Sequence, residues 1–121
     1  MKNSEVTAAK FTVVFLEDAA KFLDGLSEKV RDKIIYNITK AKFSNDRNLF
    51  KKIRLEIWEF RTLFNKTHYR LFAFWDKTEK TNTIVIVTHG LIKKTDKTPQ
   101  TDLDKAEQVR KIYFELKIKK A

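Results

Sequence analysis

The feature that most constrains the fold of this chain is a change of hydrophobic period near residue 50. Before it, apolar residues recur at helical spacing. After it, apolar and polar residues alternate, as along half-buried strands. This second pattern predicts three strands, at residues 54–63, 67–76 and 83–89. Asn65-Lys66 and residues 77–82 are the turns between them, so the strands should form an antiparallel meander.

The first half of the chain predicts one strand and two helices. Residues 8–16 are rich in β-branched and aromatic side chains, which favour a strand. Glu17 and Asp18 suit the start of a short helix that ends at Gly25. Ser27 suits the cap of a second helix. The apolar positions along that second helix are Leu26, Val30, Ile34, Ile38 and Ala41.

A last helix is predicted near the end of the chain. Residues 43–48 are a polar connection, and Thr101 with Asp104 resembles a capping box that starts this helix. The apolar residues on its face are Leu103, Ala106, Val109, Tyr113 and Leu116, before a basic tail at 117–120. The element order is therefore β-α-α-β-β-β-α. It describes a single α+β domain over residues 1–121, with helices on one side of a small sheet.

The charge of the chain is strongly positive and unevenly distributed. Lys and Arg number 26 against 16 Asp and Glu, which gives a net charge of +10. Residues 1–50 contribute +2 (9 basic, 7 acidic) and residues 51–121 contribute +8 (17 basic, 9 acidic). The positive electrostatic field of the second half attracts polyanions. Nucleic acid is the commonest such partner, and an acidic protein would fit equally well. A charged surface that keeps a small domain soluble is the other interpretation.

Composition also excludes several classes of protein. The chain has no cysteine, which rules out disulfides, thiolate zinc sites and a cysteine nucleophile, and its 2 histidines do not make a His-rich metal site. No apolar run approaches the roughly 20 residues of a membrane helix, and no signal peptide is evident. A cytoplasmic protein without a membrane partner is the simplest expectation.

The Asn65-Lys66 turn, if it holds two residues, fixes the register of the hairpin. The expected pairs are Phe64 with Thr67, Leu63 with His68, Thr62 with Tyr69, and Arg61 with Arg70. Two arginines that face each other require an internal carboxylate or an anionic ligand between them. Glu59 lies on the same face of the sheet.

The two faces of the hairpin differ in character. One is expected to be an open surface, and it carries Leu55, Ile57, Glu59, Arg61, His68, Arg70, Phe72 and Phe74. The other is more apolar and should pack on the helices, and it carries Trp58, Phe60, Tyr69, Leu71, Ala73 and Trp75.

A basic segment at 89–99 follows the third strand. It begins at His89-Gly90 and ends at Pro99. Its ammonium and hydroxyl groups are suited to bind phosphate oxygens, or the segment is simply a solvated connection. The residues concerned are Lys93, Lys94, Thr95, Lys97 and Thr98.

Three stretches of the chain resemble the signature blocks of RelE/ParE superfamily toxins, in their phage-derived HigB-like branch. They are Trp58-Glu59-Phe60-Arg61, Tyr69-Arg70-Leu71-Phe72-Ala73-Phe74 and residues 89–99. The last is the most distinctive, because it combines Gly-x-x-Lys-Lys-Thr-x-Lys-Thr-Pro with a capped helix. The resemblance covers residues 11–113, and the predicted element order agrees with the family's fold.

The resemblance implies a toxin of a type II toxin–antitoxin pair. Such an mRNA interferase enters the A site of the 70S ribosome, cleaves translated mRNA and inhibits translation. The 2′-hydroxyl of the RNA attacks the adjacent phosphate, so neither a metal nor a cofactor is expected. A cognate antitoxin of the helix-turn-helix, HigA-like type would hold the toxin inactive.

The resemblance also implies roles for individual residues. Arg70 matches the active-site arginine that stabilises the phosphate, and Arg61 would share this role. Lys93 is the catalytic candidate of the basic segment, where one lysine protonates the leaving oxygen or binds the flanking phosphate. RelE itself has lysines in the strand that here holds Glu59. Glu59 is therefore the first candidate for the general base, or else a structural partner of the arginines.

His68 is the second candidate for the base, with an ordinary sheet residue as its alternative role. The remaining expected RNA contacts are Lys51, Lys52, Arg54, Phe72, Lys94, Thr95, Lys97 and Thr98. Phe72 and Phe74 would stack on a base, or else lie under the last helix.

Two other functions stay open at this point. ParE-type toxins inhibit DNA gyrase with the same fold, so fold alone does not decide the activity. A non-catalytic relative that only binds nucleic acid is the other possibility.

Overall fold

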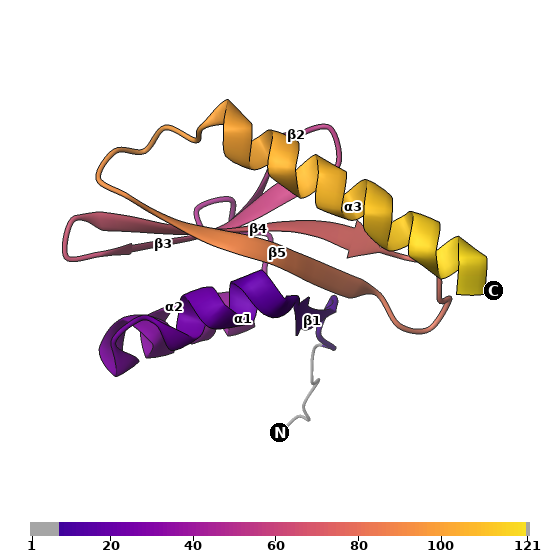
Figure 1. The fold of residues 1–121 in the computed structure, drawn as a ribbon. Helices are drawn as coiled ribbons and strands as arrows, with labels where there is room; N and C mark the ends of the chain where they lie inside the picture. The colour runs from indigo at the N-terminus through magenta and orange to yellow at the C-terminus, as the bar shows by residue number, and fades with distance from the viewer. Residues whose placement is uncertain (1–7, 121) are drawn as a thin grey trace, which may run out of the picture.

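The computed structural model describes residues 8–120 and forms an α+β domain (Figure 1). Its elements are β1 (Thr12–Phe15), α1 (Glu17–Asp24), α2 (Glu28–Ala41), β2 (Phe50–Arg54), β3 (Ile57–Phe64), β4 (Thr67–Asp76), β5 (Ile84–Lys93) and α3 (Gln100–Lys120). The strands form one mixed sheet in the order β1-β5-β4-β3-β2. The predicted α+β class is confirmed, and β3, β4 and β5 form the predicted antiparallel meander.

The predicted register of the central hairpin is also confirmed. Arg61 pairs with Arg70, and the other three expected pairs between β3 and β4 form as well. Asn65 and Lys66 have φ values of 51° and 62°. Two successive residues with positive φ make the tight turn whose twist matches that of the flanking strands.

The sheet has two edge strands, β1 and β2, and the sequence did not predict β2 as a strand. Residues 54–63 do not form one strand, because the chain turns at Leu55-Glu56, where Leu55 has a φ of 52°. β2 precedes this turn and pairs antiparallel with β3, whereas β1 pairs parallel with β5 at the other edge. The sheet is therefore mixed rather than purely antiparallel.

Helices cover both faces of the sheet, which corrects the prediction that they lie on one side (Figure 1). α1 and α2 pack on the face that carries Phe60 and Leu71, and α3 packs on the face predicted to be open. Ile57, Phe72 and Phe74 on that second face are fully buried. Three large apolar side chains on one face favour a cover over exposure to water, and α3 provides it.

Polar contacts hold α3 near both of its ends. Near the C-terminal end, the buried carboxylate of Asp76 accepts hydrogen bonds from Tyr113 Oη and Lys117 Nζ, both at 2.6 Å. Near the start, His89 Nε2 lies 3.0 Å from Asp102 Oδ1. These contacts determine where the segment between β5 and α3 crosses the sheet.

Candidate active site

The predicted arginine pair lies at the centre of a polar cluster on the α3 face of the sheet. β3 carries Glu59 and Arg61, and β4 carries Arg70 opposite Arg61. The Arg70 side chain is only 3% exposed and that of Arg61 is 19% exposed. Two guanidinium groups are thus fixed side by side on rigid strands, where like charges need a counter-ion.

Glu59 is the inner counter-ion of the two arginines. Its Oε1 accepts a hydrogen bond from Arg70 Nη1 at 2.5 Å and lies 3.4 Å from Arg61 Nε. Its Oε2 accepts a hydrogen bond from Thr98 Oγ1 at 3.1 Å. The side chain is 1% exposed. Both oxygens of this carboxylate are therefore engaged, and water has almost no access to it.

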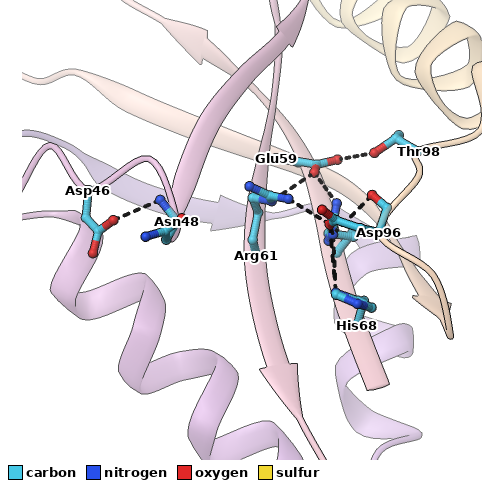
Figure 2. Close-up of polar contacts among 8 residues, drawn as sticks. Asp46, Asn48, Glu59, Arg61, His68, Asp96 and Thr98 are labelled. Atoms are coloured by element: carbon cyan, nitrogen blue, oxygen red, sulfur yellow. Dashed lines mark hydrogen bonds and ion pairs between the residues drawn. The ribbon is translucent and has the colours of Figure 1, made fainter. Parts of the chain in front are cut away.

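Asp96 is the outer counter-ion, on the segment between β5 and α3. Its Oδ1 accepts hydrogen bonds from Arg61 Nη2, at 2.8 Å, and from Arg70 Nη2. In Figure 2 the side chains of Glu59, Arg61, Asp96 and Thr98 converge at one place on the sheet. The hydrogen bond from Arg70 and the charge of Arg61 hold the pKa of Asp96 below its usual range. Unlike Glu59, Asp96 is 69% exposed, so solvent reaches it freely.

His68 and Lys93 lie beside this cluster. His68 Nδ1 is 3.4 Å from Arg70 Nη2 and 3.9 Å from Asp96 Oδ1. Lys93 faces His68 in the register of β4 and β5. The register therefore puts Lys93 beside His68, on the face of the sheet that carries the arginines.

A cavity of about 270 Å³ opens at the exposed side of the cluster. It is lined by Asn48, Arg61, Thr62, Leu63, His68, Arg70 and Asp96. In chemical terms, this hollow presents two cations and an imidazole to any anion that replaces the Asp96 carboxylate.

Most of the basic segment predicted to bind phosphate is exposed. β5 extends to Lys93, so the connection itself starts at Lys94. Lys94 donates a hydrogen bond to Thr67 Oγ1 at 3.3 Å, and the side chains of Thr95 and Lys97 are exposed. Thr98, in contrast, is bound to Glu59 and supports the cluster from inside.

Three predicted RNA contacts have other surroundings. Phe72 is fully buried and stacks on His89 with 4.8 Å between ring centroids, so the expectation that it stacks on a base is wrong. Phe74 is equally buried under α3. Arg54 is bound to the carboxylates of Asp104, at 2.5 Å, and Glu107, at 3.0 Å, so it joins β2 to α3.

Lys51 and Lys52 lie on opposite faces of β2. Lys51 faces Glu59 in the register and so lies on the side of the arginine pair, whereas Lys52 faces Trp58. The register thus puts Lys51 on the same face of the sheet as the predicted site and Lys52 on the opposite face.

Comparison with known families gives a match over most of the chain. Residues 21–111 match the family described as "Phage derived protein Gp49-like (DUF891)". The chain belongs to this Gp49-like family. The family is RelE-like and toxin-like, and the matched residues include the whole arginine cluster. No curated protein matches the chain.

Asp96 is the residue of this Gp49-like site that sequence reasoning missed. Its only signal is an acid in an otherwise basic segment, opposite two arginines that need a counter-ion. Within residues 8–120, no three His, Cys, Asp or Glu side chains gather as metal ligands. None of the helices in the same residues is long and apolar enough to cross a membrane.

Proposed function

We propose that this Gp49-like chain is the toxin of a type II toxin–antitoxin system and cleaves mRNA on the ribosome without a metal. The observation that carries the proposal is the arginine pair. Two nearly buried guanidinium groups share one exposed carboxylate oxygen, that of Asp96. An RNA phosphate that takes the place of this carboxylate would receive the same two charge-assisted hydrogen bonds.

The charge balance of the cluster supports phosphate as the ligand. Arg61 and Arg70 carry two positive charges and Glu59 carries one negative charge, so an excess of one positive charge faces the cavity. Asp96 neutralises it in the free protein. A phosphodiester brings one negative charge and gains more in the transition state, which fixed guanidinium groups stabilise without reorganisation.

Proton transfer would use His68 and Lys93. The 2′-hydroxyl oxygen attacks the phosphorus atom and its proton passes to the imidazole ring of His68, whose Nδ1 lies 3.9 Å from the carboxylate oxygen that phosphate would replace. The bond from phosphorus to the 5′-oxygen breaks, and that oxygen takes a proton from the Lys93 ammonium group. The products are a 2′,3′-cyclic phosphate and a free 5′-hydroxyl.

Glu59 would act as a positioning residue in this mechanism. Both of its oxygens are already hydrogen-bonded inside the protein, and its side chain is buried and does not line the cavity. The burial of Glu59 therefore favours His68 over Glu59 as the base. Glu59 would fix the directions of the two guanidinium groups.

Other residues would bind the phosphates that flank the cleaved bond. Lys51, Lys94 and Lys97 surround the cavity side of the sheet, and Thr95 adds a hydroxyl group. Such contacts make binding to RNA dependent on salt but not on sequence. Within this proposal the chain belongs to the HigB-like branch and works in the cytoplasm. Its partners are the 70S ribosome and a helix-turn-helix antitoxin of the HigA type.

Cell-free translation tests the proposal. The purified protein is added with and without ribosomes, and mRNA ends are mapped by primer extension. We expect cuts within codons that require ribosomes, carry a 5′-hydroxyl and persist in EDTA-treated protein. His68→Gln and Arg70→Ala should lose the cuts, whereas Lys29→Ala, an exposed charge change on α2, should retain them.

Circular dichroism of each variant shows whether it is folded, and His68→Gln keeps the test valid if Arg70→Ala unfolds. Intact mRNA with the folded wild-type protein would overturn the proposal. Inhibition of DNA supercoiling by gyrase in the same preparation would then point to the ParE-type activity.

A further inference from the structure

A second hollow lies on the other face of the sheet, beside the edge strand β2. It has a volume of about 320 Å³ and is lined by the partly exposed indole rings of Trp58 and Trp75, together with Phe50. The two indole rings lie 5.5 Å apart with an angle of 71° between their planes. We call this hollow the tryptophan groove.

The charged residues that line the tryptophan groove itself are basic, and Glu56 lines an adjoining hollow that shares both indoles and Lys52. Lys10, Arg47 and Lys52 line the groove, Lys51 borders it from the edge strand although its register assigns its side chain to the face of the arginine pair, and no carboxylate lines it among the residues that the structure describes. Lys77 adds a further cation, because its Nζ lies 4.9 Å from the centre of the Trp75 ring.

The surface near α3 makes a contrast. A larger hollow of about 800 Å³ is lined there by four acidic residues, Glu56, Asp104, Glu107 and Glu115, and by two basic ones, Arg110 and Lys111. Around the indoles, basic residues therefore outnumber acidic ones: Lys10, Arg47, Lys52 and Lys77 border them, against the single carboxylate of Glu56.

We propose that the tryptophan groove binds an unpaired stretch of RNA, with a nucleobase against the indoles and the neighbouring phosphates on the cations. Aromatic rings bordered by cations are the combination that binds single strands, because every base has a face to stack and every nucleotide a phosphate. An acidic peptide would satisfy the cations but leave the indoles unused. A duplex hides the faces of its bases, so it fits the groove poorly.

The position of the groove connects it to the arginine pair. Ser44, Asn45 and Arg47 line the groove, and Asn48 lines the cavity that contains Arg61. Figure 2 shows Asn48 beside Arg61, on the side away from Asp96. The segment 44–48 thus separates the two sites by a few residues of chain. An RNA strand that leaves the arginine cavity across this segment reaches the indoles.

The choice of RNA over DNA rests on the proposed function, whereas the preference for unpaired nucleotides rests on the groove alone. The groove is also independent of catalysis, because no residue assigned a proton-transfer role lines it. Binding at the groove and cleavage at the arginine pair are therefore measured separately.

Intrinsic fluorescence reports directly on this groove, because the chain has only 2 tryptophans and both line it. The probe is a 2′-O-methyl RNA hexamer, which lacks the attacking hydroxyl and stays intact. We expect saturable quenching by the hexamer. Inorganic polyphosphate, a polyglutamate peptide and a duplex of the same sequence should quench much less at equal charge.

Variants separate stacking from charge. Trp58→Leu should weaken binding about tenfold or more, with Trp75 still reporting. Lys52→Ala should weaken binding several-fold. It should also reduce by about one the slope of the logarithm of the binding constant against the logarithm of the salt concentration. Lys29→Ala removes an equally exposed lysine at the far end of α2 and should change neither. If Trp58→Leu does not fold, the lysine pair still decides the result.

Three results would overturn the proposal that the groove binds RNA. The first is no quenching by a hexamer that filter binding shows to be bound, and the second is quenching by polyphosphate or polyglutamate equal to that by the hexamer. The third is an equal loss of affinity for the hexamer in Lys52→Ala and Lys29→Ala. If the hexamer quenches the fluorescence but mRNA stays intact in cell-free translation, the groove proposal stands and the proposed function is rejected. Ribosome-dependent cleavage without quenching would do the reverse.

Discussion

Replacement of Glu59 by glutamine tests whether this carboxylate positions the arginine pair or takes the proton. The substitution preserves shape and removes one charge between two guanidinium groups, that of Arg70 almost inaccessible to water and that of Arg61 only partly exposed. If Glu59 is the inner counter-ion, the variant should lose stability as well as activity. A residue that acts only as a base would lose activity while the fold remained as stable as before.

The size of the effect follows from the contacts. Breaking a buried ion pair from one side costs about 3–5 kcal/mol, because the remaining charge is left without its partner. Two features reduce this cost for Glu59→Gln. The amide oxygen still accepts one hydrogen bond from Arg70, and Asp96 still contacts both arginines. We therefore expect a loss of about 2–3 kcal/mol in the free energy of unfolding.

Thermal and urea unfolding followed by circular dichroism measure this loss. For a domain of this size it corresponds to a melting temperature lower by roughly 10 °C. Glu56→Gln is the matched control, because it removes an exposed carboxylate two residues past the end of β2 and should shift the melting temperature by less than about 2 °C. Phosphate should raise the melting temperature of the Glu59 variant more than that of the wild type. Equal melting temperatures for Glu59→Gln and wild type would refute the reasoning.

Three further substitutions test other parts of the structure. Asp76→Asn should cost about 2 kcal/mol at neutral pH, because Lys117 loses its partner. Burial alone would raise the pKa of Asp76, but hydrogen bonds, that from Lys117 foremost, hold it well below the usual range. The contribution of Asp76 to the free energy of unfolding is therefore full above about pH 4 and is lost as the pH falls through the lowered pKa. In urea unfolding, the difference in stability between wild type and Asp76→Asn should accordingly become smaller in acid. Asp96→Asn should tighten the binding of inorganic phosphate several-fold in calorimetry, because a neutral amide competes less for the arginines; unchanged affinity would contradict this competition. Gly90→Ala should cost about 1–3 kcal/mol in urea unfolding, because its Cβ would lie 2.3 Å from the Phe22 ring, and a neutral result would show that the ring moves freely.

The central hairpin could be predicted from the sequence because local rules determine it. A two-residue turn at Asn65-Lys66 fixes which residues face each other, and alternation then fixes the face of every side chain. The arginine pair and the nearby carboxylate of Glu59 follow from this register alone. The expectation that two opposed arginines require a negative group was therefore sound, and it named one of the two carboxylates found there.

The elements that the sequence did not predict depend on contacts between distant parts of the chain. Nothing local marks the turn at Leu55, since leucine rarely adopts a positive φ. The cover over Phe72 and Phe74 depends on where α3 docks. A clue was present, because both faces of β4 carry large apolar residues and an open face would leave them in water.

The docking of α3 also explains why Asp96 escaped prediction. Asp96 lies between β5 and α3, so its position relative to the arginines is determined by the anchors of that helix on the sheet and not by any strand register. The site thus combines two kinds of charge. Arg61, Arg70 and Glu59 are fixed by the sheet, whereas Asp96 is brought in by a connection and remains accessible to solvent. An incoming phosphate competes only with Asp96 for the two arginines. The rigid cations therefore need no rearrangement to bind it, and the cost of binding is mainly that of displacing one exposed carboxylate.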